Sequence, residues 1–374
     1  MKIFIICPTY RNKNFANNIR YFGIVSLLKQ IKEQKGNHDI KIAIADSSYN
    51  SHDFFKNHDN MKSNDYLYFH INNRNNIDAQ IKNNFSYACS FLPNDNELRS
   101  NKWQKIVKQN TAWDRFFPWE DNYPATNPIY DQIYNERPTI GMMRNFSIAA
   151  LEEKFGESDL IIYADDDDIR NQNYIDNLVN GIKNNDFTRM FRYYTFVFDI
   201  NQWGEYNINF IQDINNNWLP DSNEKSIVLK NNLINSTYKT TVGEKYSKPI
   251  CLAFSPIASV GALHCFKFSL WKQSIEEFGG IPITSTCEDH LFYINCQKLL
   301  GNSFKVTDTK ITEPCFIRTS CGTNMSVIEW TKDLQEHEVS NWAINYINEY
   351  KNILKLDKND LTKYCHDNYS SYTD

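Results

Sequence analysis

Four short apolar runs constrain most strongly what this chain can fold into. In chain order they read KIFIIC from Lys2, IKIAIA from Ile40, YLYFHI from Tyr66 and DLIIYA from Asp159. The first run hardly alternates between apolar and polar residues, which is typical of a strand that is buried on both faces of a sheet. Strands of this kind predict a sheet that is covered by helices on both sides.

Stretches with helical spacing separate or follow these runs. Between the first two, apolar residues recur at Ile19, Phe22, Val25, Leu28 and Ile31. Further helices are expected over GMMRNFSIAALEEKFG from Gly141 and over the apolar stripe from Val339 to Leu354. The pattern predicts an α/β fold with a Rossmann-like, mostly parallel central sheet flanked by helices, and a helical extension at the C-terminal end.

The chain of 374 residues is long enough for one large domain or two ordinary ones. We expect one domain over residues 1–310, with halves 1–170 and 171–310, and the helical extension over residues 311–374. Residues of about 85–135 are rich in Pro, Asn and aromatic side chains. This segment is expected to be an irregular insertion, either a lid-like loop or an ordinary surface excursion.

Composition narrows the classes of function. The net charge of -5 does not favour a nucleic-acid partner, which usually requires a basic stripe. The sequence shows no signal-peptide pattern at Met1 and no uncharged apolar run of the roughly 18 residues that a membrane span needs. Nine cysteines without CxxC pairing suggest reduced thiols. We therefore expect a cytoplasmic protein.

Four consecutive aspartates, Asp165–Asp168, directly follow the fourth apolar run. Ligands of open α/β sheets bind at the carboxyl ends of the strands, where this run would lie. Carboxylates there are suited to a hard divalent cation such as Mg²⁺ or Mn²⁺. An EF-hand is a poor alternative, because Ile169 and Arg170 stand where a ligand and a glycine are needed. The other alternative is a helix N-terminus with acids in its first turn.

The aspartates belong to an ordered series of short motifs. These are CPTYRN at the first strand end, IAIADSS at the second, GMMRNFSIAA before the aspartates, and GGIPITSTCEDHLF far downstream. Together they resemble the inverting family-2 glycosyltransferases, which have the GT-A fold. The resemblance covers roughly residues 1–300, and it implies a nucleotide-sugar-binding half over 1–170 and an acceptor-binding half over 171–310.

The resemblance implies roles for individual residues at the donor site. Arg144 would lie near the nucleotide or its phosphates, and Asp46 would accept a hydrogen bond from a uracil-type base. The other implied donor-site residues are Pro8, Thr9 and Tyr10 around the nucleotide, with Tyr10 near the base, and Asp165 and Asp166 at the ribose or donor sugar.

It also implies roles in metal binding and catalysis. Asp167 would bind the metal, assisted by Asp168, with Mn²⁺ or Mg²⁺ as cofactor. Asp289 would be the general base, and Glu288 would help to position the acceptor. His264 is a further candidate metal ligand, although a lone His in an apolar run is more often a core residue. The family's later His ligand has no counterpart in EPCFIRTSCGTNMS, which leaves the third ligand open.

Each of these residues also has an ordinary structural interpretation. Thr9 and Tyr10 could be turn residues, and Asp46 could cap a helix. Arg144 could pair with an acid at the surface. Glu288 and Asp289 could simply be acids in the first turn of a helix. It is the order of the motifs, and their placement at predicted strand ends, that favours the functional interpretation.

The resemblance implies a metal-dependent inverting transfer of a sugar from a nucleotide donor, expected to be UDP-linked, to a hydroxyl of a glycan or glycolipid. The sequence style suggests bacterial surface polysaccharide, such as capsule or lipopolysaccharide. A lipid-linked acceptor would make the enzyme peripheral at the inner face of the cytoplasmic membrane, and the C-terminal helix could serve docking or a homodimer. A nucleotidyltransferase is an alternative, but CPTYRNKNF lacks its glycine-rich loop. A calcium-dependent glycan-binding module is the second alternative.

Overall fold

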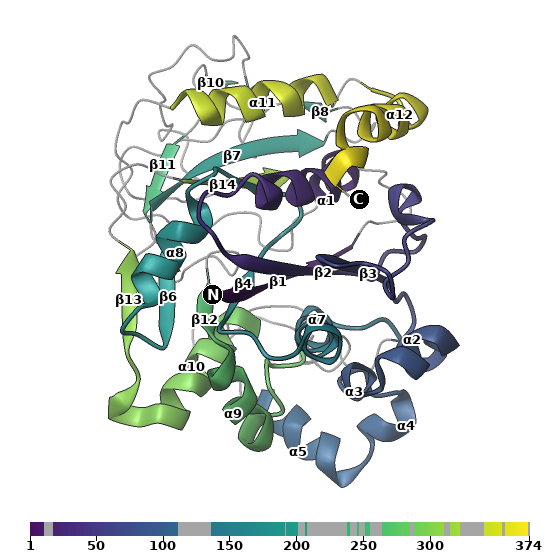
Figure 1. The fold of residues 1–374 in the computed structure, drawn as a ribbon, viewed down its shortest axis with the longest axis vertical. Coiled ribbons are helices and arrows are strands. Elements are labelled where there is room, and N and C mark those ends of the chain that lie inside the picture. The colour runs from purple at the N-terminus through teal and green to yellow at the C-terminus, as the bar shows by residue number, and fades with distance from the viewer. Residues whose placement is uncertain are drawn as a thin grey trace.

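A seven-stranded sheet forms the centre of the fold (Figure 1). The structure is a computed structural model, and it describes residues 1–10, 18–110, 136–190, 192–200, 206–207, 238–239, 245–246, 251–254, 264–284, 288–309, 315–321, 340–353 and 356–372. The strands of the sheet are, in spatial order, β13 (Val306–Thr309), β6 (Phe187–Met190), β12 (Cys265–Lys267), β4 (Leu160–Tyr163), β1 (Lys2–Thr9), β2 (Asp39–Asp46) and β3 (Tyr66–His70).

The four strands that the apolar runs predict are the parallel part of this sheet. β4, β1, β2 and β3 are parallel to one another, and β13 is parallel to β6. β12 is antiparallel to both β4 and β6. The chain therefore has an α/β fold with a mostly parallel central sheet, as the sequence predicts.

Strand β1 is buried on both faces because helices cover the sheet on both sides. Phe4 and Ile6 pack in the core on the side of α7 (Ile140–Phe155). Ile5 and Cys7 pack on the other side, with α1 (Asn18–Lys32) and α8 (Tyr174–Ile182). Figure 1 shows α1 and α7 on opposite faces of the sheet.

Two helical glycines allow close approaches that a side chain would prevent. A Cβ on Gly23 of α1 would lie 1.7 Å from the backbone oxygen of Asp166. A Cβ on Gly141, in the first turn of α7, would lie 1.7 Å from the backbone oxygen of Pro282. Both distances are far below any van der Waals contact, so α1 is held against the acidic turn and α7 against the segment that precedes Glu288.

The last two helices pack on the outer side of α1. They are α11 (Asn341–Ile353) and α12 (Lys358–Tyr369). Phe22 of α1 lies edge-on against Tyr350 and Tyr369, with ring centroids 5.2 and 5.3 Å apart. All three rings are buried. The C-terminal stripe therefore packs back on the body of the protein (Figure 1).

A second sheet adjoins the acidic turn. Its strands are, in spatial order, β11 (Cys251–Phe254), β7 (Arg192–Ile200), β14 (Phe316–Cys321) and β5 (Ile169–Arg170), with β8 (Tyr206–Asn207) on β7. A separate pair joins β9 (Tyr238–Lys239) and β10 (Lys245–Tyr246). Because β5 directly follows the four aspartates, the acidic turn connects the two sheets.

Part of the segment expected to be irregular is helical. The short helices there are α3 (Ser86–Cys89), α4 (Asp95–Leu98) and α5 (Asn101–Asn110), and α2 (Ala79–Asn84) directly precedes the segment. The capping box of Asn94 and Glu97 starts α4, and Trp103, Ile106 and Val107 of α5 are buried. Local caps and tertiary packing thus form helices that the polar composition hides. Residues 111–135 lie outside the described part of the chain.

Each of the two larger sheets contains strands from more than one of the expected sequence ranges. β6, β12 and β13 come from residues 171–310 but share the central sheet with strands from residues 1–170. β14 lies within 311–374 and pairs with β5 and β7, so this range is not helical throughout.

Two further helices among the described residues are α9 (Phe268–Phe278) and α10 (Glu288–Leu300). Among the described residues, no helix is long and apolar enough to cross a membrane.

Candidate active site

The carboxyl ends of β1, β2 and β4 meet at one edge of the sheet. Thr9 ends β1, Asp46 ends β2, and the four aspartates follow β4. Ser47 donates its backbone N–H to the backbone oxygen of Thr9 over 3.0 Å. The Thr9 hydroxyl donates to Asp166 over 2.7 Å. These hydrogen bonds link the end of β1 to the acidic turn and to the residue after Asp46. The predicted donor-site residues Pro8, Thr9, Asp46, Asp165 and Asp166 therefore lie at one edge.

The four aspartates do not share one environment. Asp166 and Asp167 are buried and pair with Arg20 of α1, at 2.5 and 3.0 Å. Asp168 is also buried, whereas the side chain of Asp165 is 33% exposed. Burial raises the pKa of Asp166 and raises that of Asp167 to about 6, although Arg20 opposes both shifts.

Arg170 stabilises the backbone of the acidic turn through hydrogen bonds. Its guanidinium donates to the backbone oxygens of Asp168 and Asp165, over 3.0 and 3.2 Å. Its backbone N–H donates to the side chain of Gln30 on α1 over 2.8 Å. The turn is therefore held by its backbone as well as by its carboxylates.

Arg144 connects the acidic turn to the Glu-Asp pair. Its Nε donates to Glu288 over 3.2 Å, and its second terminal nitrogen donates to Asp165 over 3.4 Å. The guanidinium lies 3.9 Å from the centre of the Tyr163 ring, a cation–π arrangement. Arg144 itself is 3% exposed. Two motifs that are 120 residues apart in the sequence thus meet on one buried cation.

Asn145 holds the segment that leads into α10. Its side-chain amide donates to the backbone oxygen of Ile281 over 2.7 Å. Its oxygen accepts from the backbone N–H of Ile281 and from the indole of Trp271, each over 2.9 Å. Gly279 and Gly280, at φ of 76° and 90°, provide the turn that brings Ile281 there. The Arg-Asn pair therefore has divided roles: Arg144 binds the acids and Asn145 binds the Gly-Gly turn.

Glu288 and Asp289 begin α10 beside Arg144. Glu288 is buried, and Asp289 is half-buried. Burial raises the pKa of Glu288 to about 7, against the opposing charge of Arg144 and with a further upward contribution from Asp289. Asp289 is thus the more exposed of the two acidic residues.

The raised pKa of Glu288 predicts a dependence of stability on pH. Unfolded Glu ionises near pH 4.5, while folded Glu288 keeps its proton until about pH 7. The folded state thus binds more protons in this window, and the free energy of unfolding should fall as pH rises through it. We expect Glu288→Gln to reduce this fall by about 2–3 kcal/mol. Urea unfolding between pH 4.5 and 8 measures it.

The exposed Glu276 of α9 provides the control for this prediction. Glu276→Gln should leave the fall unchanged. Part of the fall should remain in Glu288→Gln, because the pKa values of Asp166 and Asp167 are also raised. An unfolding free energy with the same pH dependence in Glu288→Gln and the wild type would contradict the burial argument.

Asp46 and Tyr10 lie at the predicted edge but differ in accessibility. Asp46 is fully buried; it accepts from the hydroxyl of Tyr68 over 2.7 Å and from the backbone N–H of Ser48 over 2.9 Å. Tyr10 is 39% exposed, and the guanidinium of Arg137 lies 4.2 Å from its ring centre. In this arrangement the side chain of Tyr10 is accessible to solvent, whereas the carboxylate of Asp46 is hydrogen-bonded within the protein.

The described donor set does not form a cation site. No group of three His, Cys, Asp or Glu side chains among the described residues is placed to hold a metal ion. Asp167 faces Arg20, and His264 packs between the rings of Tyr163 and Phe187, with centroids 5.9 and 4.9 Å away. Binding of Mn²⁺ or Mg²⁺ by Asp167, Asp168 and His264 stays a prediction that this arrangement does not support.

Sequence reasoning did not identify three residues that matter at this edge. Arg20 lies in the predicted first helix but outside its apolar stripe, and Arg137 follows the segment that looked irregular. Asn145 stood beside Arg144 in the motif without a role of its own. The signal for Arg20 was present: two buried acids at a strand end require a buried or half-buried cation nearby.

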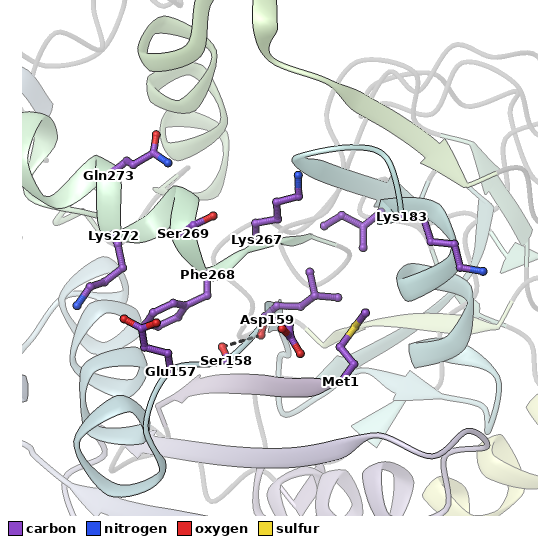
Figure 2. A pocket seen from close by; sticks show the side chains of 12 residues that line it. Met1, Glu157, Ser158, Asp159, Lys183, Lys267, Phe268, Ser269, Lys272 and Gln273 are labelled. Carbon is purple, nitrogen blue, oxygen red and sulfur yellow. Dashed lines mark hydrogen bonds between the residues drawn. The ribbon is translucent and has the colours of Figure 1, made fainter.

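A hollow of about 620 Å³ lies at the opposite edge of the sheet (Figure 2). Met1, Asp159 and Lys267 line it at the amino ends of β1 and β4 and at the end of β12. Lys267 pairs with Asp186 over 2.9 Å, and Figure 2 shows the labelled lysines pointing in different directions. The side chains do not converge on one point, and the candidate site remains at the carboxyl edge.

Comparisons with known proteins give structural neighbours only. No protein-family model matches the chain, and no curated protein matches its sequence. A structure of TarS 1-349 from S. aureus is similar at 12% identity and a TM-score of 0.38, over 85% of this chain and 60% of that one. The complex of TarS 1-349 with UDP-GlcNAc gives 10% identity and a TM-score of 0.35, over 99% and 74%. The chain thus spans about 60% of the length of the first neighbour, and the similarity concerns the fold alone.

Proposed function

We propose that this chain is a glycosyltransferase that moves a sugar from a nucleotide donor to a hydroxyl group, with inversion at the sugar carbon. The observation that carries the proposal is Arg144, which joins Asp165 at the end of β4 to Glu288 at the start of α10. A donor bound at the strand ends and an acceptor bound at Asp289 would meet across this cation. The site thus unites two reacting partners at the edge where α/β sheets bind ligands.

Each residue of the candidate site has a chemical task in this proposal. Asp289 takes the proton of the attacking hydroxyl, which requires a carboxylate within hydrogen-bond reach of it. Glu288 and Arg144 keep Asp289 in place. Asp165 accepts hydrogen bonds from a ribose or sugar hydroxyl, and the exposed Tyr10 offers a ring for stacking of the base.

The leaving diphosphate carries negative charge that has to be neutralised. Arg137 provides a cation next to Tyr10, on the nucleotide side of the edge. Dependence on Mn²⁺ or Mg²⁺ stays a prediction to be tested, and no step above relies on a metal.

We propose a UDP-linked donor and a glycan or lipid-linked glycan acceptor, as in bacterial surface polysaccharide synthesis. TarS 1-349 has been solved with UDP and with UDP-GlcNAc, which makes these two compounds suitable first probes. The choice among sugars and acceptors depends on the shape of the site.

A thermal-shift screen against nucleotide sugars, each with and without Mn²⁺, tests the proposal. A ligand that binds the folded state raises Tm by mass action. At a ligand concentration of 100 times Kd, the folded state is stabilised by about 2.7 kcal/mol. We expect a UDP-sugar to raise Tm and free UDP to compete with it. A shift with Ca²⁺ but with no nucleotide would support a glycan-binding module instead. A shift with nucleoside triphosphates alone would support a nucleotidyltransferase.

A further inference from the structure

Two carboxylates of the acidic turn are buried where water cannot solvate their charge. Asp166 is fully buried and Asp167 is 3% exposed. Removing an ionised carboxylate from water is costly unless a positive charge and hydrogen bonds replace the lost hydration. The local structure therefore has to provide a cation to this turn.

Arg20 provides that cation from helix α1. One terminal nitrogen lies 2.5 Å from Asp166, and the other lies 3.0 Å from Asp167. The guanidinium thus donates a hydrogen bond to Asp166 and forms an ion pair with Asp167, so that one cation bridges two consecutive carboxylates. The second oxygen of Asp166 accepts from the hydroxyl of Thr9 over 2.7 Å. Gly23, one turn further along α1, allows the helix to approach the backbone of Asp166 closely enough for this bridge.

We propose that Arg20 is the resident counter-ion of the acidic turn, and that Asp166 and Asp167 bind Arg20 rather than a metal ion. Arg20 is then a positioning residue. Its bridge turns two carboxylates inward, toward α1, and leaves Asp165 as the partly exposed one at the edge of the sheet. The part of the inference that concerns Asp165 rests on the proposed function; the bridge itself does not.

A divalent cation would be poorly accommodated at Asp167 in this arrangement. One carboxylate oxygen of Asp167, Oδ2, lies 3.0 Å from a guanidinium nitrogen of Arg20. A divalent cation on this oxygen would lie close to the positive charge of Arg20, and two positive charges at close range repel each other, most strongly where water is excluded. Mg²⁺ also requires near-octahedral oxygen coordination, and no three potential ligands come together among the described residues.

A set of variants tests the bridge through stability. Arg20→Met should lower Tm by several degrees, because it leaves two buried carboxylates without this cation. The double variant Arg20→Met/Asp166→Asn should recover part of that loss. Lys32→Met is the matched control, since it removes one positive charge from an exposed position of the same helix and should leave Tm nearly unchanged. Equal Tm values for Arg20→Met and Lys32→Met would overturn the proposal.

A second measurement does not require an Arg20 variant to fold. Free Mn²⁺ is titrated into the wild type and Asp167→Asn, with binding followed by electron paramagnetic resonance and Tm. The proposal expects the two proteins to respond alike. Loss of a wild-type Mn²⁺ response in Asp167→Asn would show that Asp167 is a ligand and would overturn it. Binding of UDP-sugars to the wild type tests the proposed function separately, because neither readout here depends on nucleotide.

Discussion

Asp289→Asn is expected to lower the rate of sugar transfer by about 10²–10⁴-fold, with donor affinity nearly unchanged. The amide is almost the same size as the carboxylate but cannot take a proton from the acceptor hydroxyl. Glu288 is not expected to replace it, because Glu288 is buried and bound to Arg144. Release of UDP in the presence of acceptor measures the rate, and calorimetry with UDP-sugar measures the affinity.

The control for this experiment is Glu276→Gln, which neutralises an exposed acid on α9. Its transfer rate should equal that of the wild type. A transfer rate within a few-fold of wild type in Asp289→Asn would show that another group accepts the proton. Loss of donor affinity without loss of rate at saturation would instead place Asp289 in donor binding.

At pH 8, above the pKa of Glu288, Arg144→Met is expected to lower the free energy of unfolding by about 3–5 kcal/mol, because it leaves the ionised Glu288 and Asp165 without their shared cation. Methionine keeps much of the length of the side chain but neither its charge nor its donors. The double variant Arg144→Met/Glu288→Gln should recover part of the loss, since one buried acid is then neutral. Urea unfolding measures all three proteins.

Lys272 provides a matched control for Arg144. Lys272 of α9 pairs with Glu152, which lies on α7 like Arg144, over 2.7 Å. The side chain of Lys272 is 38% exposed. A surface pair of this kind contributes about 0–1 kcal/mol, so Lys272→Met should have a small effect. If Arg144→Met and Lys272→Met lower the free energy of unfolding equally, the buried bridge between the acidic turn and Glu288 does not stabilise the fold more than a surface ion pair does.

The sequence predicted the central sheet and one edge of it well. The apolar runs that contain Ile5, Ile44, Leu67 and Ile161 are all strands of the central sheet, because a strand buried on both faces must be apolar along its length. The placement of the acids followed from the same reasoning. Once parallel strands are predicted, the residues after them lie at one edge.

The partners of these acids could not be predicted, because they depend on contacts between distant parts of the chain. Arg20 meets Asp166 only because α1 packs across the sheet, and no local pattern encodes that contact. Asn145 likewise meets Ile281 only because α7 packs against the segment that contains Ile281. Asp46 looked available to a base, but Tyr68 on the next strand lies within reach of its carboxylate. The identity of a residue states what it is able to bind, whereas packing decides which partner it has.

The packing of the C-terminal helices α11 and α12 on α1 has a consequence for folding during synthesis. Phe22 leaves the ribosome early, while its aromatic partners Tyr350 and Tyr369 follow more than 300 residues later. At synthesis rates of roughly 5–20 residues per second, the delay is on the order of 20–70 s. During that time the nascent chain carries an uncovered ring on the helix that also holds Arg20. The final docking of the C-terminal helices is therefore a step that chaperones could protect and that a premature stop would abolish.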